Sequence, residues 1–388
     1  MDFLLPSTDR NRADDVIDDL IEKVLAAYPP ERLERVKGRT EAMWKGMGAD
    51  SPYHDRVPYV LFSNHWPEEP VIPEDADELQ RSTINELKMM LQHAVIDDEF
   101  YPAFSSGVDQ LTIPSLFKCE NDSASASARI KPVIKTPSDV YSLPDAEIRE
   151  GRACYDMLYR MVYKYRRTGG RIPVYMTDVQ GPFSCAAQMW GIQEFLCDLD
   201  EYSDEVHHLL SLCTDAIIYY FHAMFDAVDG NLVPIHCPPA LWIPKDCGVA
   251  VSDDFFAVVG GHTVKEFSMP YLERIGEEFG GITAHSCGNM NHLASIMGSM
   301  KNLKALNFSA SETNLMKFAR ECDPRIPLIV HKTELAVGGL PLLTPEEHLR
   351  YCADVQRATG VRIFSSPRGT DDPCNEANLK RWEDAARL

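Results

Sequence analysis

Residues 280–309, GGITAHSCGNMNHLASIMGSMKNLKALNFS, decide the fold class. A short β-branched run ends at His285, a helical stretch follows at 291–300, and a second apolar run begins at residue 303. A strand, a helix and a strand of these lengths form a parallel βαβ unit. The same alternation continues on both sides of this stretch, so we expect a sheet of parallel strands.

About eight strand candidates alternate with helical stretches along the chain, with 109–117 as a weak strand. Polar side chains follow the predicted strands at their carboxyl ends: Asn64, Asp178, His236, Asp253, His285, Asn307, His331 and Ser365. In a (β/α)8 barrel that end carries the active site. A doubly wound sheet also binds ligands there, but the glycine-rich phosphate-binding motifs of nucleotide-binding sheets are absent. The sequence therefore predicts an α/β fold, a single TIM-type (β/α)8 barrel at 51–388, preceded by an N-terminal helical extension at 1–50.

Composition limits the class of function. The chain has 388 residues, a formal net charge of −21 and 11 cysteines without the spacing of a disulfide framework. An acidic surface of this size repels nucleic acid and anionic membranes. The N-terminus lacks the pattern of a signal peptide, and the apolar runs are far shorter than the roughly 18 residues of a membrane span. We therefore expect a cytoplasmic protein with reduced thiols and neither nucleic-acid nor membrane partners.

His285 and Cys287 are the most informative pair of polar residues. Residues i and i+2 of an extended chain point to the same side, so this imidazole and this thiol are expected to face one cavity. Together they suit Zn²⁺, and Gly288 lets the backbone turn sharply after the thiol. The alternative is a hydrogen-bonded histidine next to a buried, inert cysteine.

Other strand ends carry weaker candidates. Asp253 and Asp254 could orient a ligating histidine or cap the next helix. Asp178 and Gln180 could bind a substrate or belong to the turn at 181–182. Adjacent strand residues face opposite ways, so His236 is a candidate without Cys237. His331 is a candidate base or ligand, and Asn64 is a further candidate. The alternative for each is a hydrogen-bonded core residue without a functional role.

Three stretches resemble the uroporphyrinogen decarboxylase superfamily. They are AHSCGNM (284–290), VSDDFFAVVGGHTVKEFSMPYLERI (251–275) and VQGPFSCAAQMWGIQEFLCDLDEYSDEVHHLL (179–210). The resemblance covers about residues 55–385 and is most specific in 172–290. It implies a single (β/α)8 barrel.

The superfamily has two functional branches. Uroporphyrinogen decarboxylases need no metal and hold an acidic tetrapyrrole with an arginine-rich motif near the N-terminus. Here the first strand end reads VLFSNHWPEEP (60–70), with acids in place of arginines. The chain is more similar to the other branch, the corrinoid-dependent methyltransferases. The thiol-methylating members of that branch carry His-x-Cys and a distant second cysteine as zinc ligands, and His285 and Cys287 match the first two.

The third ligand departs from the family pattern. The last turn reads SSPRGTDDPC (365–374), with serines at the expected place and Cys374 some residues later. Cys374 is the expected ligand if the loop folds inward; otherwise a Ser, Asp or His replaces it, or no metal binds.

The resemblance implies a methyltransferase that moves a methyl group between a corrinoid (cobalamin) protein and a thiol or tetrahydrofolate, assisted by zinc. Expected partners are the corrinoid protein and a small-molecule donor or acceptor, and a homodimer is compatible with the sequence. The alternatives are a metal-free decarboxylase-like lyase and a non-catalytic barrel that binds a ligand or a corrinoid protein. The expected roles are catalytic for Asp253, Asp178 and His331, substrate-binding for Asn64, Gln180, His236 and Asn307, and metal-binding for His285, Cys287 and Cys374.

Overall fold

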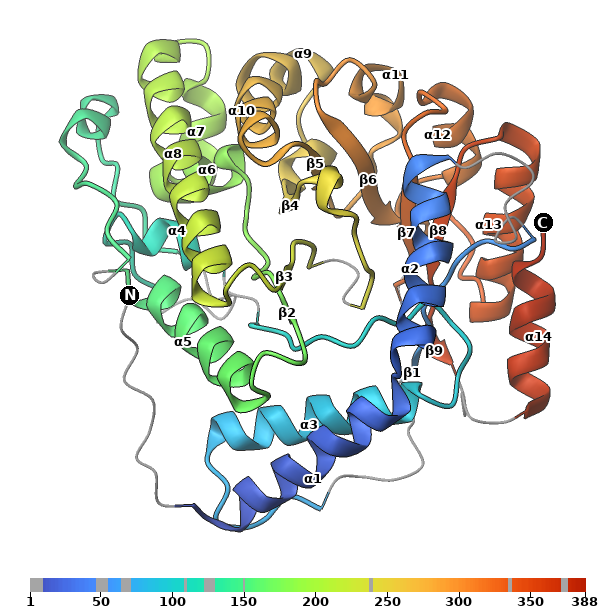
Figure 1. Cartoon of the computed structure of the whole chain (residues 1–388). Coiled ribbons are helices and arrows are strands. Elements are labelled where there is room, and N and C mark those ends of the chain that lie inside the picture. Colours follow the sequence, from blue (N-terminus) through green and yellow to red (C-terminus); the bar gives the residue numbers. More distant parts are fainter. Residues whose placement is uncertain are drawn as a thin grey trace.

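The structure is a computed structural model that describes residues 10–46, 55–63, 71–107, 110–121, 130–148, 151–236, 240–333, 337–370 and 376–388. Its chain begins with two helices, α1 (Arg12–Ala27) and α2 (Pro30–Lys45), which confirms helical structure in the predicted extension. α1 lies against α3 (Glu78–His93) at the lower edge of the molecule (Figure 1). The domain boundary between residues 50 and 51 stays a prediction, because 47–54 lie outside the described residues.

Parallel strands form the centre of the molecule, as expected. The main sheet has five strands in sequence order: β4 (Val249–Ser252), β5 (Ile282–His285), β6 (Leu303–Ser309), β7 (Leu328–His331) and β8 (Ile363–Ser366). Two short parallel pairs join β2 (Val174–Tyr175) to β3 (Leu232–Val233) and β1 (Phe62–Ser63) to β9 (Arg368–Thr370). All these pairings are parallel, as a chain of βαβ units requires.

Single backbone hydrogen bonds continue the ring between these sheets. The N–H groups of Val60, Glu99, Tyr175 and Ala250 donate to the carbonyl groups of Ser365 (3.1 Å), Tyr59 (2.9 Å), Phe104 (2.7 Å) and Pro234 (3.0 Å), respectively. These bonds run from β8 through residues 57–61 and 99–104 to β2, and from β3 to β4. The predicted TIM-type barrel is confirmed, and the stretch at 99–104 contributes to it although its sequence gave no strand signal.

A buried carboxylate stabilises the seam between 57–61 and 99–104. Oε2 of Glu99 accepts the N–H of Tyr59 at 2.5 Å, and Oε1 pairs with Arg56 at 2.7 Å and with Arg39 at 3.0 Å. Glu99 is fully buried. Because an unpaired buried charge is costly, the two guanidinium groups are what allow this carboxylate to take the place of a missing ladder bond.

Helices surround the strands (Figure 1). They are α4 (Thr112–Ser115), α5 (Arg152–Arg167), α6 (Pro182–Trp190), α7 (Ile192–Asp198), α8 (Ser203–Ala227), α9 (Gly261–Thr263), α10 (Met269–Phe279), α11 (Ala294–Met297), α12 (Leu315–Glu321), α13 (Pro345–Thr359) and α14 (Glu376–Ala386). Shorter turns are η1 (Pro137–Ser142), η2 (Lys245–Cys247), η3 (Asp254–Ala257), η5 (Asn291–Leu293) and the π-helical η4 (Val264–Ser268). No helix in the described ranges combines the length and hydropathy needed to cross a membrane.

The weak strand expected at 109–117 was wrong, because α4 occupies that stretch. The N–H of Ser115 donates to the carbonyl of Leu111 at 2.7 Å, which is a helical bond. All four residues of α4 are buried. A short apolar run that is buried on every side does not distinguish a strand from a helical turn by periodicity.

His348, a buried histidine of α13, is expected to make the folded protein less stable in mild acid. Burial lowers the pKa of His348 from 6.5 to about 4. Between these values the unfolded chain binds a proton that the folded chain does not, so stability is complete above pH 6.5 and decreases as the pH falls toward 4. We expect a loss of about 2 kcal/mol from this residue between pH 7 and pH 5. Urea unfolding at both pH values should show that His348→Gln reduces the difference by that amount; an unchanged difference would contradict the assignment.

Candidate functional site

The carboxyl ends of neighbouring strands meet at one edge of the sheet. Ser252 pairs with His285 across β4 and β5, and His285 pairs with Asn307 across β5 and β6. The His285 ring lies 5.8 Å from the His331 ring and 6.4 Å from the His236 ring, centroid to centroid. Four of the predicted site residues therefore lie together at this end of the barrel.

Three side chains of different chemistry meet just beyond β4 and β5. Nε2 of His285 lies 3.5 Å from Sγ of Cys287 and 3.9 Å from Oδ1 of Asp254. The three donor atoms all lie within 4.8 Å of one another. His285 is buried, whereas Cys287 is exposed, so the cluster is open to solvent on the thiol side. We refer to Asp254, His285 and Cys287 as the donor cluster.

The backbone around the thiol is fixed by its neighbours. The N–H of Cys287 donates to Oδ1 of Asp254 at 2.8 Å, and the N–H of Gly288 donates to Oε2 of Glu312 at 3.0 Å. Gly288 has φ +86°, and a Cβ on it would lie 2.5 Å from the Cβ of Ala257. A glycine is therefore required for the turn that follows the thiol.

Asn307 determines which nitrogen of His285 faces the cluster. Oδ1 of Asn307 lies 2.5 Å from Nδ1 of His285, and Nδ2 of Asn307 donates to the carbonyl of Ile329 at 2.7 Å. Since the amide oxygen only accepts, the proton of His285 is assigned to Nδ1 and the lone pair to Nε2. The same amide nitrogen lies 3.5 Å from Nδ1 of His331. Burial lowers the pKa of His331 well below its usual value, so this ring is neutral at neutral pH.

A second hydrogen-bonded group lies beside the donor cluster. Oγ of Ser252 donates to Oδ1 of Asp178 at 2.8 Å and lies 2.9 Å from Nε2 of His236. Nε2 of His236 is also 3.1 Å from Oδ1 of Asp178, which assigns its proton to Nε2. Nδ1 of His236 is buried and has no hydrogen-bond partner within the described residues. Burial lowers the pKa of His236, so a neutral ring presents Nδ1 as an acceptor.

The remaining predicted residues are placed differently. Asp253 is fully buried, and its carboxylate accepts hydrogen bonds from Ser184 at 2.9 Å and Ser268 at 2.8 Å, away from the donor cluster. Burial raises its pKa to about 7. Its contact with His285 runs through the backbone, where its N–H donates to the His285 carbonyl at 2.7 Å.

Gln180 is buried and bridges to Ser252 through the backbone. Asn64 and Cys374 lie outside the described residues.

Asp254 is the residue that sequence reasoning placed second to Asp253. The sequence did not single out Asp254, because its position depends on the register between β4 and β5, in which Ser252 lies opposite His285. Two residues further along each strand, the same rule that pairs His285 with Cys287 brings Asp254 to Cys287.

The donor cluster fits a zinc ion by the chemistry of its atoms. Carboxylate oxygen, imidazole nitrogen and thiolate sulfur are the three kinds of atom that bind zinc in proteins. The hydrogen bond from His285 to Asn307 leaves Nε2 unprotonated, as a ligand requires, and second partners of this kind are typical of metal-binding histidines. Catalytic zinc sites have three protein ligands and one open position.

Comparisons with known proteins agree with the fold. Residues 53–233 match the family model of uroporphyrinogen decarboxylase (URO-D), a range that ends before β4 and so does not include the donor cluster. The solved structure of a methyltransferase from Methanosarcina mazei has a TM-score of 0.59 and 16% sequence identity, and the alignment covers 90% of this chain and 98% of that one. At this identity the likeness shows the fold.

N-(5'-phosphoribosyl)anthranilate isomerase from Pyrococcus furiosus has a TM-score of 0.27 and 10% identity, over 73% of this chain and 98% of that one. A score this low adds nothing to the argument. A comparison with curated protein sequences finds no significant match.

Proposed function

The chain belongs to the uroporphyrinogen decarboxylase superfamily, and from that premise we propose that it is a methyltransferase. It would move a methyl group between a corrinoid protein and a thiol or tetrahydrofolate, with zinc bound at the barrel mouth. The observation that carries this proposal is the donor cluster, in which three zinc-type donor atoms lie within 4.8 Å of one another. The fold similarity to a solved methyltransferase is consistent with it.

Asp254, His285 and Cys287 would hold the metal, with Cys374 as a further expected ligand. Bound zinc would supply a Lewis acid that lowers the pKa of an acceptor thiol, so that the acceptor is a thiolate at neutral pH. Asp254 also accepts the N–H of Cys287, and this bond holds the thiol toward His285.

The neighbouring polar residues are proposed to bind the substrate and to accept its proton. Nδ1 of His236 is an acceptor with no hydrogen-bond partner among the residues that the structure describes, and Asp178 and Ser252 hold the ring in place through Nε2. His331 is a second neutral imidazole, and its ring centroid lies 5.8 Å from that of His285. Gln180 and Asn64 would complete the substrate contacts. Asp253 is proposed to act by positioning, through its backbone bond to His285, rather than by touching substrate.

A cytoplasmic location is part of the proposal. The nine cysteines in the described ranges are all free thiols. Free thiols in this number are typical of a reducing compartment.

The acidic character of the chain argues against the decarboxylase alternative. A tetrapyrrole with several carboxylates needs a cationic site, whereas this chain has a net charge of −21 and places Asp178 and Asp254 at the barrel mouth. A non-catalytic barrel would need neither a neutral acceptor imidazole nor a solvent-accessible thiol beside it.

The test combines metal analysis with a transfer assay. Protein purified without chelator should contain one equivalent of zinc and should demethylate methylcobalamin when a thiol or tetrahydrofolate from a panel is present, seen as the change in the corrinoid spectrum. Turnover of uroporphyrinogen, followed by fluorescence of the oxidised products, would support the lyase instead. Zinc without turnover of either substrate would support the binding barrel.

Asn307 gives a prediction that separates metal binding from folding. Asn307→Leu removes the acceptor that keeps the proton on Nδ1 of His285, so zinc affinity should decrease about 10- to 100-fold. Asn307→Asp keeps that acceptor and should lose less. Competition with a chromophoric chelator measures both affinities; equal affinities for the two variants would contradict the proposed role of Asn307.

A further inference from the structure

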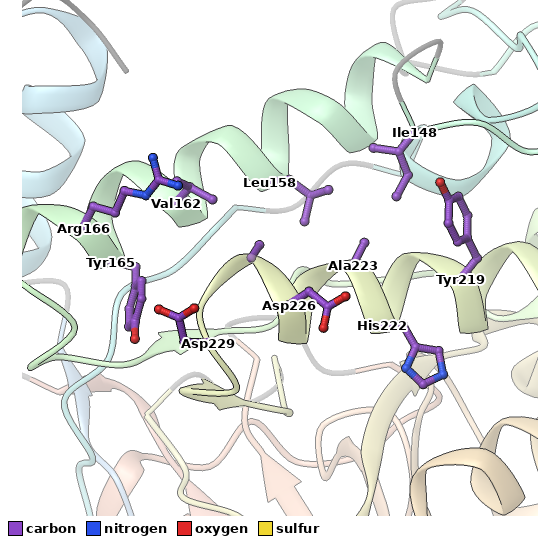
Figure 2. A pocket seen from close by; sticks show the side chains of 11 residues that line it. Ile148, Leu158, Val162, Tyr165, Arg166, Tyr219, His222, Ala223, Asp226 and Asp229 are labelled. Carbon is purple, nitrogen blue, oxygen red and sulfur yellow. The ribbon is translucent and has the colours of Figure 1, made fainter. Parts of the chain in front are cut away.

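Two hollows away from the donor cluster differ in size and in the charges that line them. The larger lies between α5 and α8 and has a volume of about 300 Å³ (Figure 2). It carries both signs of charge, because Arg166 lines the same groove as Asp226 and Asp229. The smaller, of about 20 Å³, lies between α2, residues 56–58 and the start of β8. We refer to it as the arginine cavity after its charged lining residues, Arg39, Arg56 and Arg362.

The side-chain polar groups that line the arginine cavity are hydrogen-bond donors. Oε1 of Gln356 accepts the N–H of Ile363 at 2.8 Å, which leaves the amide NH₂ group of that side chain for the cavity. The carbonyl of Pro58 accepts the N–H of Ser365 at 2.9 Å and is used in the barrel wall. Because guanidinium and amide NH₂ groups only donate, the cavity favours an acceptor. The remaining lining residues are apolar: Ala42, Met43, Pro58 and Ile363.

Two carboxylates pair with the arginines and still leave one positive charge unbalanced. Oε1 of Glu99 lies 2.7 Å from Arg56 and 3.0 Å from Arg39, and Asp97 pairs with Arg39 at 2.9 Å. Neither carboxylate lines the cavity. Arg56 makes both of its hydrogen bonds, to Glu99 and to the carbonyl of Asp97, through Nη2, so its other N–H groups are left for the cavity. Three guanidinium groups and two carboxylates sum to a net charge of +1.

Arg362 carries the unbalanced charge. Its Nη2 donates to the carbonyl of Arg325, and it has no ion-pair partner among the residues that the structure describes. Its guanidinium group lies against the end of α2, since a Cβ on Gly46 would lie 2.1 Å from its Nη1. The partial negative charge of a helix end offsets only part of a full charge. Burial accordingly lowers the pKa of Arg362. An anion beside this group would remove the cost of burying it without a counter-charge.

We propose that the arginine cavity binds a single chloride ion, held by Arg56, Arg362 and the amide group of Gln356. A volume of about 20 Å³ holds one particle of the size of a water molecule, which suits a monatomic anion and excludes sulfate or phosphate. A water molecule fits by size, but it is neutral and leaves the net charge of +1 in place. One monovalent anion balances that charge.

The position of the cavity indicates what the ion does. Arg362 directly precedes β8, so the cavity lies at the amino end of this strand, whereas the donor cluster lies at the carboxyl ends of β4 and β5. A bound ion would link α2 to residues 56–58 and to the start of β8. In a (β/α)8 barrel the amino ends of the strands serve stability and the carboxyl ends serve catalysis. Chloride should therefore stabilise the folded chain in proportion to its occupancy.

Thermal unfolding and chlorine NMR test the site on the full chain. At constant ionic strength, potassium chloride replaces potassium gluconate, whose anion is too large for the cavity. The melting temperature of the unmodified chain should rise by about 2 °C and then level off, and the protein should broaden the chloride resonance. Arg362→Met should raise the half-saturating chloride concentration at least about tenfold, because it removes a charged donor. Arg166→Met removes an exposed arginine from the groove in Figure 2 and should keep both responses.

A second variant keeps the test decisive if Arg362→Met fails to fold. Gln356→Glu retains the acceptor for the N–H of Ile363 and adds a carboxylate to the cavity lining. This carboxylate takes the place of the bound anion and balances the charge of Arg362. The variant should therefore neither broaden the chloride resonance nor change its melting temperature when chloride replaces gluconate.

Three results would overturn the proposal. A chloride response of the same size in the unmodified chain, Arg362→Met and Gln356→Glu would be a general salt effect. An unmodified chain that leaves the chloride resonance sharp would show that the cavity holds no chloride. Displacement of chloride by an equal concentration of sulfate would show a site for a larger anion. None of these outcomes depends on whether the chain transfers methyl groups.

Discussion

Cys287→Ala is expected to remove the bound zinc and to lower methyl transfer at least about a hundredfold. The thiol is one of three donor atoms in the described cluster, and its Sγ lies 3.5 Å from Nε2 of His285. With a carboxylate and an imidazole alone, the site would lose the soft ligand that best suits zinc. Metal content by mass spectrometry and the rate with methylcobalamin are the two measurements.

A second exposed thiol provides the control for this variant. Cys197 on α7 is exposed like Cys287 but does not belong to the donor cluster. Cys197→Ala should therefore keep both the zinc and the rate. If Cys287→Ala retained stoichiometric zinc, the proposed donor cluster would be wrong, even if activity were lost.

Gly248→Ala is expected to have the largest effect on stability, at least about 4 kcal/mol, or to prevent folding. Gly248 has φ +74°, and a Cβ there would lie 1.8 Å from the carbonyl oxygen of Gly281. Gly281 directly precedes β5, so the clash with its backbone is relieved only if β4 and β5 move apart. These are the two strands that lead into the donor cluster.

Gly360→Ala is the control that separates the steric clash at Gly248 from the strain of a positive φ. It has φ +75°, and a Cβ on it would meet no atom within 4 Å. Gly360→Ala should therefore cost only about 1 kcal/mol, the usual price of a left-handed non-glycine residue. Urea unfolding of both variants measures the difference; similar losses would show that backbone strain, rather than the contact with Gly281, limits Gly248.

The sequence predicted most of the barrel because its strands are marked by short apolar runs between helical stretches. The helix expected at 345–359 has those bounds in the structure, since Thr344 and Glu347 form a capping box and Gly360 ends it. The seam at 99–104 was missed for a physical reason. It pairs through isolated bonds and a buried carboxylate, Glu99, and neither leaves a period of two in the sequence.

The candidate site was partly predictable for a similar reason. The convergence of His285 and Cys287 follows from the period of a strand, and the structure brings them together. The position of Asp254 depends on the register between β4 and β5, which no single segment reveals. The carboxylate of Asp253 turns instead toward Ser184 and Ser268, and the latter ends the π-helical turn η4.

The donor cluster draws its three side chains from two adjacent strands, β4 and β5, and their following turns. An ion bound there would cross-link β4 and β5 at one point of the barrel. Release of the ion should weaken the contact between these two strands. Amide protons of β4 and β5 would therefore exchange faster in metal-free protein, whereas the exchange rates in β7 and β8 would change little. If Cys374 were a further ligand, the metal would also link β4 and β5 to the segment that follows β8. Amide exchange in the metal-bound protein would then be slower in β8 as well.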